Sequence, residues 1–324
     1  MDTPETRIHV SFALPGPAAD ELAASGLLVT AYTEQTGQPR ESLLADAAGA
    51  SGLITLLSDR VDAELLDAAG ASLKVVANFA VGYDNVDVAA ATERGVVVTN
   101  TPGVLDEATA DLAMALLLDL SRRVSEADRF LRTGAEWRWE PDLFLGLDVS
   151  AGATLGIVGL GRIGMAVATR AAAFGMRIVA TGSRASSPEA AALGVRPVSF
   201  EELLAESDAI SIHCPLTPAT RHLFGPAQFA AMKPGALLVN TARGPIVDEL
   251  ALLEALEDGR LGGAALDVFE WEPHVTPGLL TLPNVVAVPH IGSAGGATRA
   301  NMGLLAVRNA VAVVGGGQAL TPVG

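Results

Sequence analysis

The stretch Thr154-Leu-Gly-Ile-Val-Gly-Leu-Gly-Arg-Ile-Gly164 decides the fold class. An apolar strand candidate runs into Gly-x-Gly-x-x-Gly, and an Ala-rich helix candidate follows over residues 165–174. In this pattern the first glycine permits a tight turn, the second lets a pyrophosphate approach the backbone, and the third allows close helix–strand packing. The helix start adds N–H groups and the positive end of its dipole. The pattern predicts a βαβ unit that binds a dinucleotide; the alternative is a tight turn without a ligand.

Strand and helix candidates alternate on both sides of this stretch. Four strand candidates precede it, over residues 7–14, 52–57, 73–78 and 95–99. After residue 154, six more end near Gly159, Thr181, His213, Asn240, Val268 and Pro289. Such alternation predicts right-handed βαβ units and parallel sheets.

Two apolar helices suggest how the domains are arranged. One is expected over residues 107–124, and a late Ala-rich helix over 297–314 has no strand of its own, so it should pack on the first domain. We therefore expect an α/β protein in which a Rossmann-type doubly wound parallel sheet (104–289) is inserted into a flavodoxin-like substrate domain (1–103 and 290–324). The active site would then lie in the cleft between the two domains.

Composition excludes several classes of function. The 324 residues carry a formal net charge of −16, which disfavours nucleic acid and anionic membranes as partners. The single cysteine, Cys214, can form neither an internal disulfide nor a multi-cysteine zinc site, and no ligand spacing predicts a metal. The start of the chain does not resemble a secretion signal, and no apolar run reaches the ~18 residues of a membrane span. We expect a cytoplasmic protein.

The end of the second strand of the nucleotide unit bears on the choice of cofactor. NAD-selective sites usually place Asp or Glu there to bind the ribose 2′-hydroxyl. Here the strand ends in Thr181, Gly182, Ser183 and Arg184. A hydroxyl and an Arg would bind a 2′-phosphate, so the sequence favours NADP over NAD. The alternative is that Arg184 is a solvated loop residue.

Three ionisable residues each follow a strand candidate and form a possible catalytic trio: Arg243, Glu272 and His290. Parallel strands deliver their carboxyl ends to one edge of the sheet. Reduction of an oxo acid needs a cation for the carboxylate and carbonyl, an acid for the developing alkoxide, and a carboxylate that orients that acid. These three residues could supply all three roles.

Each member of the trio also has a plain structural interpretation. Arg243 could be a surface charge, and His290 a hydrogen-bonded core histidine. Glu270 competes with Glu272 for the carboxylate role, and both could be solvated. The sequence leaves these alternatives open.

Several motifs in this order resemble the D-2-hydroxyacid dehydrogenases along nearly the whole chain. They are the stretches 78–87 (Asn-Phe-Ala-Val-Gly-Tyr-Asp-Asn-Val-Asp), 100–105 (Asn-Thr-Pro-Gly-Val-Leu), 155–164, 213–217 (His-Cys-Pro-Leu-Thr), 240–244 (Asn-Thr-Ala-Arg-Gly) and 289–293 (Pro-His-Ile-Gly-Ser). Within the family, residues 56–70 and the turn at Arg184 look like glyoxylate/hydroxypyruvate reductases. Those reductases place Arg directly after the position of Gly182, whereas Ser183 intervenes here.

The resemblance implies a role for each matching position. Arg243 would bind the substrate carboxylate and carbonyl, His290 would donate the proton, and Glu272 would be its partner. The substrate side would also include Leu56, Leu57, the backbone N–H groups of Val81 and Gly82, and Trp139. Contacts to the cofactor would come from Thr109, Gly159, Gly161, Arg162, Ile163, Gly164, Ser183, Arg184, Cys214, Pro215, Thr241, Asp267 and Gly292.

The resemblance also implies an assembly. The family dimerises through the cofactor domain, and an arm that carries Trp137 and Trp139 would reach the neighbouring subunit. We therefore expect a homodimer that reduces a small 2-oxo acid of the glyoxylate or hydroxypyruvate type to the D-2-hydroxy acid with NAD(P)H.

Two alternatives remain at this stage. One is another member of the family, such as a 3-phosphoglycerate dehydrogenase. Its substrate phosphate would call for extra cations near residues 50–85, where the chain offers Arg60 and Lys74. The other is a dinucleotide-sensing corepressor, which could keep the same trio. An assay with glyoxylate and reduced cofactor separates an enzyme from a corepressor.

Overall fold

The computed structural model describes residues 6–34 and 37–323, which fall into two compact units. Unit 1 is Met1–Leu105 with Ala294–Gly324, and unit 2 is Asp106–Ser293. The division lies close to the boundaries predicted at residues 103/104 and 289/290. Residues 290–293 group with unit 2 because the N–H groups of His290, Ile291 and Gly292 donate to Asp267 over 2.8, 2.6 and 2.8 Å.

Unit 1 is built on a five-stranded parallel sheet in the order β2-β1-β3-β4-β5. Its strands are β1 (Arg7–Val10), β2 (Leu28–Ala31), β3 (Gly52–Thr55), β4 (Val75–Asn78) and β5 (Val97–Thr99). Its helices are α1 (Gly16–Ala24), α2 (Arg40–Ala47), α3 (Ala63–Ala69), α4 (Val88–Glu93) and α12 (Gly296–Val314). Strands β3 and β4 are buried along their length, which explains their nearly continuous apolar sequence.

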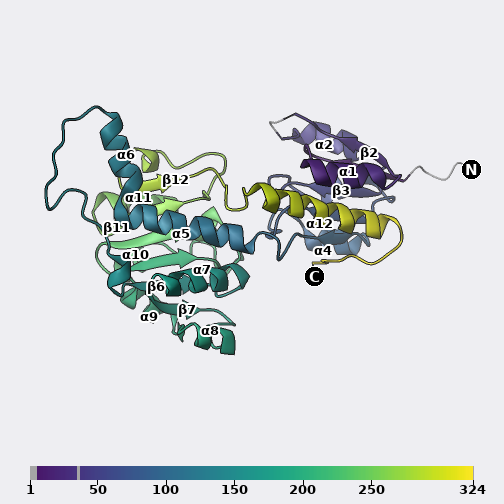
Figure 1. Ribbon diagram of the computed structural model, residues 1–324. Helices are drawn as coiled ribbons and strands as arrows, with labels where there is room; N and C mark the ends of the chain where they lie inside the picture. The colour runs from purple at the N-terminus through teal and green to yellow at the C-terminus, as the bar shows by residue number, and fades with distance from the viewer. Residues whose placement is uncertain (1–5, 35–36, 324) are drawn as a thin grey trace, which may run out of the picture. The chain divides into compact units, whose positions relative to one another are not determined.

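The late helix α12 belongs to unit 1. It packs against α1 and against strands β3, β4 and β5, so the prediction that it returns to the first domain is confirmed (Figure 1). A Cβ added to Gly52 would lie 3.0 Å from the Val314 side chain, which shows how closely the end of α12 approaches β3. Leu43 of α2 and Leu65 of α3 share another core cluster with Leu53 of β3.

Unit 2 is built on a seven-stranded parallel sheet in the order β12-β11-β10-β9-β6-β7-β8. Its strands are β6 (Thr154–Val158), β7 (Arg177–Thr181), β8 (Arg196–Pro197), β9 (Ala209–Ile212), β10 (Ala236–Asn240), β11 (Leu261–Leu266) and β12 (Val285–Ala287). Its helices are α5 (Asp106–Arg122), α6 (Val124–Arg132), α7 (Arg162–Ala173), α8 (Pro188–Ala192), α9 (Phe200–Glu206), α10 (Pro226–Ala231) and α11 (Glu249–Glu257). Three 3-10 turns are η1 (Val149–Ala151), η2 (Gly244–Ile246) and η3 (Leu279–Thr281). The predicted doubly wound α/β fold is confirmed.

Two core layers cover the faces of this sheet. On one face α5 and α7 pack together, and Leu117 and Val167 join the inward side chains of β6 and β10. On the other, side chains of α9, α10 and α11, such as Leu203, Phe229 and Leu252, form the second cluster. Strand order reverses beside β6, where doubly wound sheets bind ligands at their carboxyl ends.

The sequence did not predict several of these elements, and two strands and one helix are the main ones. They are β2 and β8 at sheet edges, and α6 after the long apolar helix. The predicted helix over 107–124 ends at Arg122 because Arg123 takes a left-handed conformation, with φ of 52°. Among the described residues, no helix is both long enough and apolar enough to cross a membrane.

Candidate active site

The three glycines of the loop after β6 differ in what lies next to their Cα atoms. Gly159 has φ of 95°, and a Cβ there would lie 2.5 Å from the Cys214 backbone nitrogen. A Cβ on Gly164 would lie 2.4 Å from the Gly159 carbonyl oxygen, so α7 can approach β6 closely because residue 164 is glycine. Above Gly161 a Cβ would meet nothing within 4 Å. This open side is where a pyrophosphate would approach the backbone.

The start of α7 is suited to an anion. Gly161 is its N-cap residue and offers no side chain to bond the first N–H groups of the helix. These groups point outward at the positive end of the helix dipole, where a phosphate is stabilised. Arg162 and Ile163 occupy the first turn. The loop and the helix start therefore fit a dinucleotide.

A buried hydroxyl beyond β10 also lacks a partner. Thr241 is buried, and its Oγ1 makes no hydrogen bond within the described parts of the chain. A buried polar atom without a partner is costly in a finished structure, so a ligand group is a natural partner for it. Thr241 was predicted to contact the cofactor, and that role stays a prediction.

Asp267, Thr109 and Gly292 lie together near the end of β11. A Cβ on Gly292 would lie 3.0 Å from Asp267 Oδ2 and 3.4 Å from Thr109 Cγ2. The Asp267 carboxylate accepts from the Ile291 and Gly292 N–H groups. Burial raises the pKa of Asp267, while these N–H groups and the positive charge on His290 act in the opposite direction. Asp267 therefore holds the turn that follows His290.

The end of β7 adjoins the glycine loop. Leu160 N–H donates to the Thr181 carbonyl over 3.0 Å, and a Cβ on Gly182 would lie 3.0 Å from the Leu160 nitrogen. Ser183 and Arg184 follow in an exposed turn. The two residues predicted to hold a 2′-phosphate are thus beside the loop predicted to hold the pyrophosphate.

His213 and Cys214 follow β9. Burial lowers the pKa of His213 to about 4, so its ring is neutral at neutral pH, with Nε2 2.7 Å from Ser211 Oγ. Burial raises the pKa of the Cys214 thiol to about 11, so the thiol stays protonated and is a poor nucleophile. The backbone of Cys214 packs against Gly159, and Pro215 is the next residue in the loop after β9.

Arg243 stands in a turn that its neighbours fix firmly. Asn240, the last residue of β10, donates from Nδ2 to the Arg243 carbonyl over 2.9 Å and accepts from the Ala242 N–H over 3.0 Å. A Cβ on Gly244 would overlap the Phe269 carbonyl group, so the turn presses against the chain after β11. In the sequence Asn240 is visible as a polar residue that ends a buried strand, and this is the signal for its role in the turn.

Glu272 and His290 form a hydrogen-bonded pair. His290 Nδ1 lies 2.9 Å from Glu272 Oε2, while Glu272 Oε1 accepts from the Phe269 N–H over 3.0 Å. Burial alone would raise the pKa of Glu272, but the His290 bond and charge, the Phe269 N–H and the Arg243 charge together lower it. Glu272 is therefore ionised at neutral pH. His290 has φ of 53°, held by its N–H bond to the Asp267 carbonyl.

Glu270, the rival of Glu272 in the sequence, has another partner. Its Oε1 lies 2.6 Å from His222 Nε2, and its Oε2 accepts from the Glu249 N–H at the start of α11. Its side chain is almost fully buried. Glu270 thus anchors α11, and Glu272 pairs with His290.

The remaining predicted substrate residues are of two kinds. Leu56, Leu57, Val81 and Gly82 lie in unit 1, in the loops after β3 and β4. Trp139 lies in the loop after α6, is 77% exposed, and belongs to a segment that protrudes from unit 2 (Figure 1).

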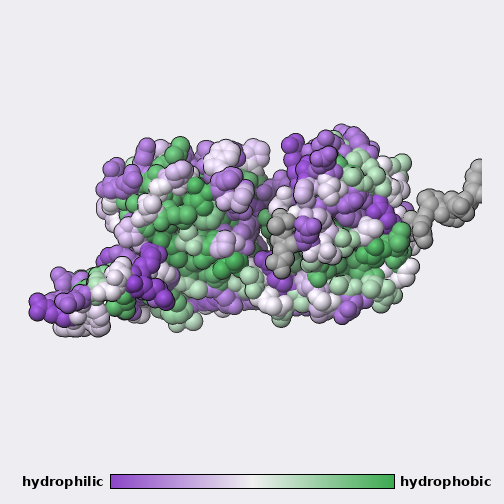
Figure 2. Space-filling view, turned by 90° about the horizontal axis from the view of Figure 1, so that it is seen from above, coloured by the Kyte–Doolittle hydropathy of each residue, from purple (hydrophilic) through white to green (hydrophobic). Residues whose placement is uncertain are grey.

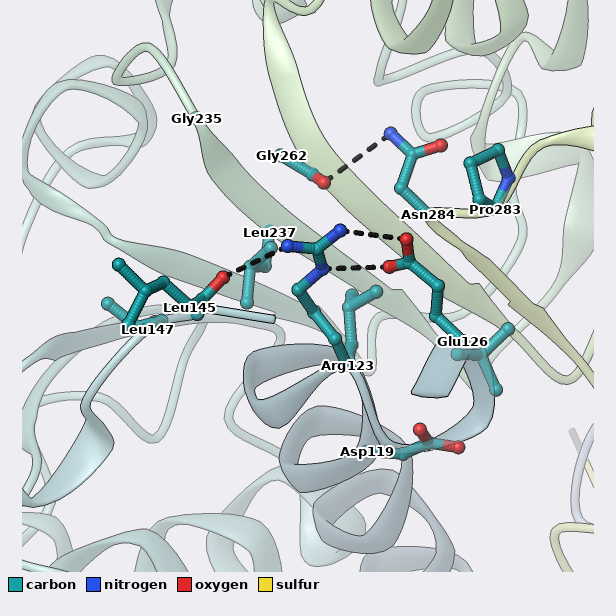
Figure 3. Close-up of a pocket in the computed structure, with 13 residues that line it drawn as sticks. Asp119, Arg123, Glu126, Leu145, Leu147, Gly235, Leu237, Gly262, Pro283 and Asn284 are labelled. Carbon is teal, nitrogen blue, oxygen red and sulfur yellow. Dashed lines mark hydrogen bonds and ion pairs between the residues drawn. The ribbon is translucent and has the colours of Figure 1, made fainter. Parts of the chain in front are cut away.

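A cavity of about 480 Å³ lies at the amino ends of the strands of unit 2. Gly235, Gly262 and Asn284 line it at the starts of β10, β11 and β12. In Figure 3, Arg123 crosses it and bonds Glu126 over 2.7 and 2.8 Å and the Leu145 carbonyl over 3.3 Å. Because Arg243, Glu272 and His290 follow the other ends of these parallel strands, the cavity is separate from the candidate active site.

The glycine loop and the His290–Glu272 pair lie at the same carboxyl edge of one parallel sheet, and together they define a dinucleotide-dependent dehydrogenase. Residues 114–292 match the model for the "D-isomer specific 2-hydroxyacid dehydrogenase, NAD binding domain". The chain belongs to the D-2-hydroxyacid dehydrogenase family, as the sequence motifs predicted, and its cofactor is a nicotinamide dinucleotide.

Individual relatives agree with this assignment. The glyoxylate reductase of Thermococcus litoralis is 50% identical over 291 residues, which is 88% of this chain and 87% of the relative. A crystal structure of a Thermus thermophilus protein superposes with a TM-score of 0.91 at 50% identity and covers 98% of this chain and 100% of that one. An NADPH-dependent glyoxylate/hydroxypyruvate reductase of Sinorhizobium meliloti, in complex with NADP and malonate, gives a TM-score of 0.85 at 37% identity and covers 99% and 97%.

Proposed function

We propose that this dehydrogenase reduces a small 2-oxo acid of the glyoxylate or hydroxypyruvate type to the D-2-hydroxy acid, with Arg243, Glu272 and His290 as its catalytic residues. The observation that carries the proposal is the hydrogen bond of 2.9 Å between His290 and Glu272. The positive charge of Arg243 also acts on Glu272 and helps to lower its pKa. The glyoxylate reductase of Thermococcus litoralis supports the choice of substrate.

The proposed chemistry divides among these side chains. The nicotinamide cofactor, when bound, supplies the hydride that reduces the carbonyl carbon. Arg243 binds the substrate carboxylate and polarises the carbonyl oxygen with its planar, charged fork. His290 uses Nδ1 for Glu272, so its Nε2 carries the proton that passes to the forming hydroxyl. Glu272, ionised, stabilises the protonated imidazole before that transfer and orients its ring.

Further contacts complete the proposed site. The backbone N–H groups of Val81 and Gly82 would bind the substrate carboxylate, and Leu56 and Leu57 would face the substrate side chain. We also propose that the enzyme works in the cytoplasm, since a single cysteine is typical of a reducing compartment.

We propose further that the cofactor is NADPH rather than NADH. Residues 179–187 contain no carboxylate, and Ser183 and Arg184 stand exposed beside the glycine loop. A charge-assisted hydrogen bond to a 2′-phosphate is worth roughly 1.5 to 3 kcal/mol, or about 10- to 150-fold in affinity. With glyoxylate as substrate, we expect kcat/KM to be higher with NADPH than with NADH, mostly through KM. Arg184→Ala should remove most of that preference.

A matched control is Arg196→Ala, which removes another exposed arginine, in the neighbouring edge strand β8. It should leave the cofactor preference unchanged. Equal kcat/KM values for the two cofactors in the wild type, or a preference that Arg184→Ala does not alter, would contradict the NADPH assignment. No turnover with either cofactor would contradict the proposed reaction itself.

The proposed assembly is a homodimer through the cofactor unit. The surface of α6 and the following loop exposes large apolar side chains, which in a monomer would face water: Val124, Leu131, Trp137, Trp139, Leu143 and Leu145. The space-filling view shows the loop projecting from unit 2 (Figure 2). The cavity at the amino ends of the strands borders the same region, and Leu145 lines it. Exposed apolar side chains of this size, gathered on one helix and the loop that follows it, favour association of two copies.

Sedimentation should show twice the mass of the chain at micromolar concentration. The double variant Leu131→Asp/Leu145→Asp should be monomeric, because each aspartate would have to be desolvated at the interface. Leu250→Asp, at an exposed leucine of α11, is the matched control and should stay dimeric. A monomeric wild type, or a dimer that survives the double change, would rule out this interface.

A further inference from the structure

The loop after β4 has three successive carbonyl groups that are held by hydrogen bonds. The Ala80 carbonyl accepts from the Thr101 N–H over 2.9 Å. The Val81 carbonyl accepts from Asn100 Nδ2 over 2.8 Å, and the Gly82 carbonyl from Asn78 Nδ2 over 2.9 Å. By contrast, the N–H groups of Val81 and Gly82 make no hydrogen bond within residues 6–34 and 37–323.

The peptide bond links these two observations. Because it is planar and trans, its C=O and N–H groups point in opposite directions within one plane. The bond from Asn100 to the Val81 carbonyl therefore fixes the direction of the Gly82 N–H. In the same way, the bond from Thr101 to the Ala80 carbonyl fixes the direction of the Val81 N–H. The Asn100 side chain is thus the group that orients one of the two donors.

Asn100 is itself firmly anchored. Its N–H donates to the Thr321 carbonyl over 3.3 Å, and its own carbonyl accepts from Thr321 Oγ1 over 2.6 Å. Thr321 is tied in turn to Asn309, a fully buried residue of α12 that bonds both the N–H and the hydroxyl of Thr321. The backbone of Asn100 is thereby held in place, while its side-chain amide donates to the loop.

We propose that Asn100 is a positioning residue for substrate binding: its side chain aims the Gly82 N–H at the carboxylate of the 2-oxo acid. This inference rests on the proposed function, which places the Val81 and Gly82 N–H groups on that carboxylate. A hydrogen bond to a charged group loses strength steeply when its angle opens, so a misdirected Gly82 peptide binds the anion weakly. Asn100 touches the peptide, and the peptide touches the substrate.

The test is a steady-state comparison with glyoxylate and NADPH. In Asn100→Ala we expect KM for glyoxylate to rise about 10-fold or more, the scale of one hydrogen bond to a charged group. The kcat value and the Kd for NADPH should change little, because the carboxylate is bound alike in the ground and transition states. Asn100→Asp keeps the shape of the side chain but loses the N–H donor. It should show the same rise in KM for glyoxylate, with little change in kcat.

Gln38→Ala is the matched control, since it removes a buried polar side chain of unit 1 that bonds His9 and Asp46 and belongs neither to the 80–82 loop nor to the anchor of Asn100. It should lower the unfolding temperature and leave KM near the wild-type value. If Gln38→Ala raises KM as much as Asn100→Ala does, Asn100 acts through stability alone and the proposal is overturned. An unchanged KM in both Asn100 variants overturns it too.

Binding of oxalate to the NADPH-loaded protein, measured by calorimetry, separates this inference from the proposed reaction. A wild type that binds oxalate more tightly than Asn100→Ala but does not reduce glyoxylate would preserve the positioning role and contradict the reaction. A wild type that reduces glyoxylate, with oxalate affinity equal in Asn100→Ala, would contradict the positioning role alone. Absence of oxalate binding by the wild type would overturn the positioning role as well.

Discussion

The variant His290→Asn should bind NADPH as the wild type does and yet reduce glyoxylate with a kcat lower by roughly 100-fold or more, the usual scale for a positioned general acid. Asparagine is the apt replacement because residue 290 has φ of 53°, a left-handed conformation that asparagine adopts readily. The backbone turn and its bonds to Asp267 should therefore survive. The measurements are kcat at neutral pH and the Kd for NADPH from fluorescence titration.

His222→Asn provides the matched control. His222 is also left-handed, with φ of 50°, and also pairs with a glutamate, but its partner Glu270 holds α11. Its kcat should stay close to that of the wild type. Near-normal turnover by His290→Asn, or an equal loss in both variants, would remove His290 from the mechanism.

The pair predicts a pH profile as well. Because the pKa of Glu272 is lowered in the folded protein, its charge and its bond to His290 persist at neutral pH and are lost only as the pH falls through that lowered pKa. Glu272→Gln removes the charge at every pH, so the protonated imidazole loses its anionic partner. The optimum for reduction should shift to lower pH, and an unchanged profile would count against the pairing.

The fold could be predicted from the sequence wherever local pattern determines structure. Three glycines lie close together in one short loop: Gly159 allows the turn, Gly161 leaves one side of the backbone open, and Gly164 allows the helix to pack closely. The late helix α12 could also be predicted, because its apolar character demands a core and the chain offered no further strand to provide one. By contrast, β2 is a four-residue edge strand whose side chains are exposed or half-buried, although its sequence, Leu28-Val-Thr-Ala31, is mostly apolar.

The site was less predictable where it depends on partners distant in the chain. Glu270 and Glu272 follow the same strand, and their spacing alone does not reveal which of them meets His290. Which glutamate pairs with His290 depends on two backbone N–H groups: that of Phe269 donates to Glu272, and that of Glu249, at the start of α11, donates to Glu270. Asn100 appeared only as part of a family motif, because its bond to Val81 spans 19 positions and becomes visible once the two loops lie together.

Arg243→Ala should lower kcat/KM for glyoxylate by at least about 100-fold, since it removes charge-assisted bonds worth roughly 1.5 to 3 kcal/mol each from both the carboxylate and the carbonyl oxygen. Arg243→Lys keeps the charge but not the planar fork, so it should raise KM and lower kcat together. Added guanidinium ion should restore part of the activity of the alanine variant and none of that of His290→Asn. Arg221→Lys, at a half-exposed arginine paired with Glu270, is the control and should change neither parameter. If Arg243→Lys altered only the unfolding temperature, Arg243 would be a residue of the β10–η2 turn rather than the anion-binding group, and the substrate carboxylate would need another cation to offset the −16 charge of the chain.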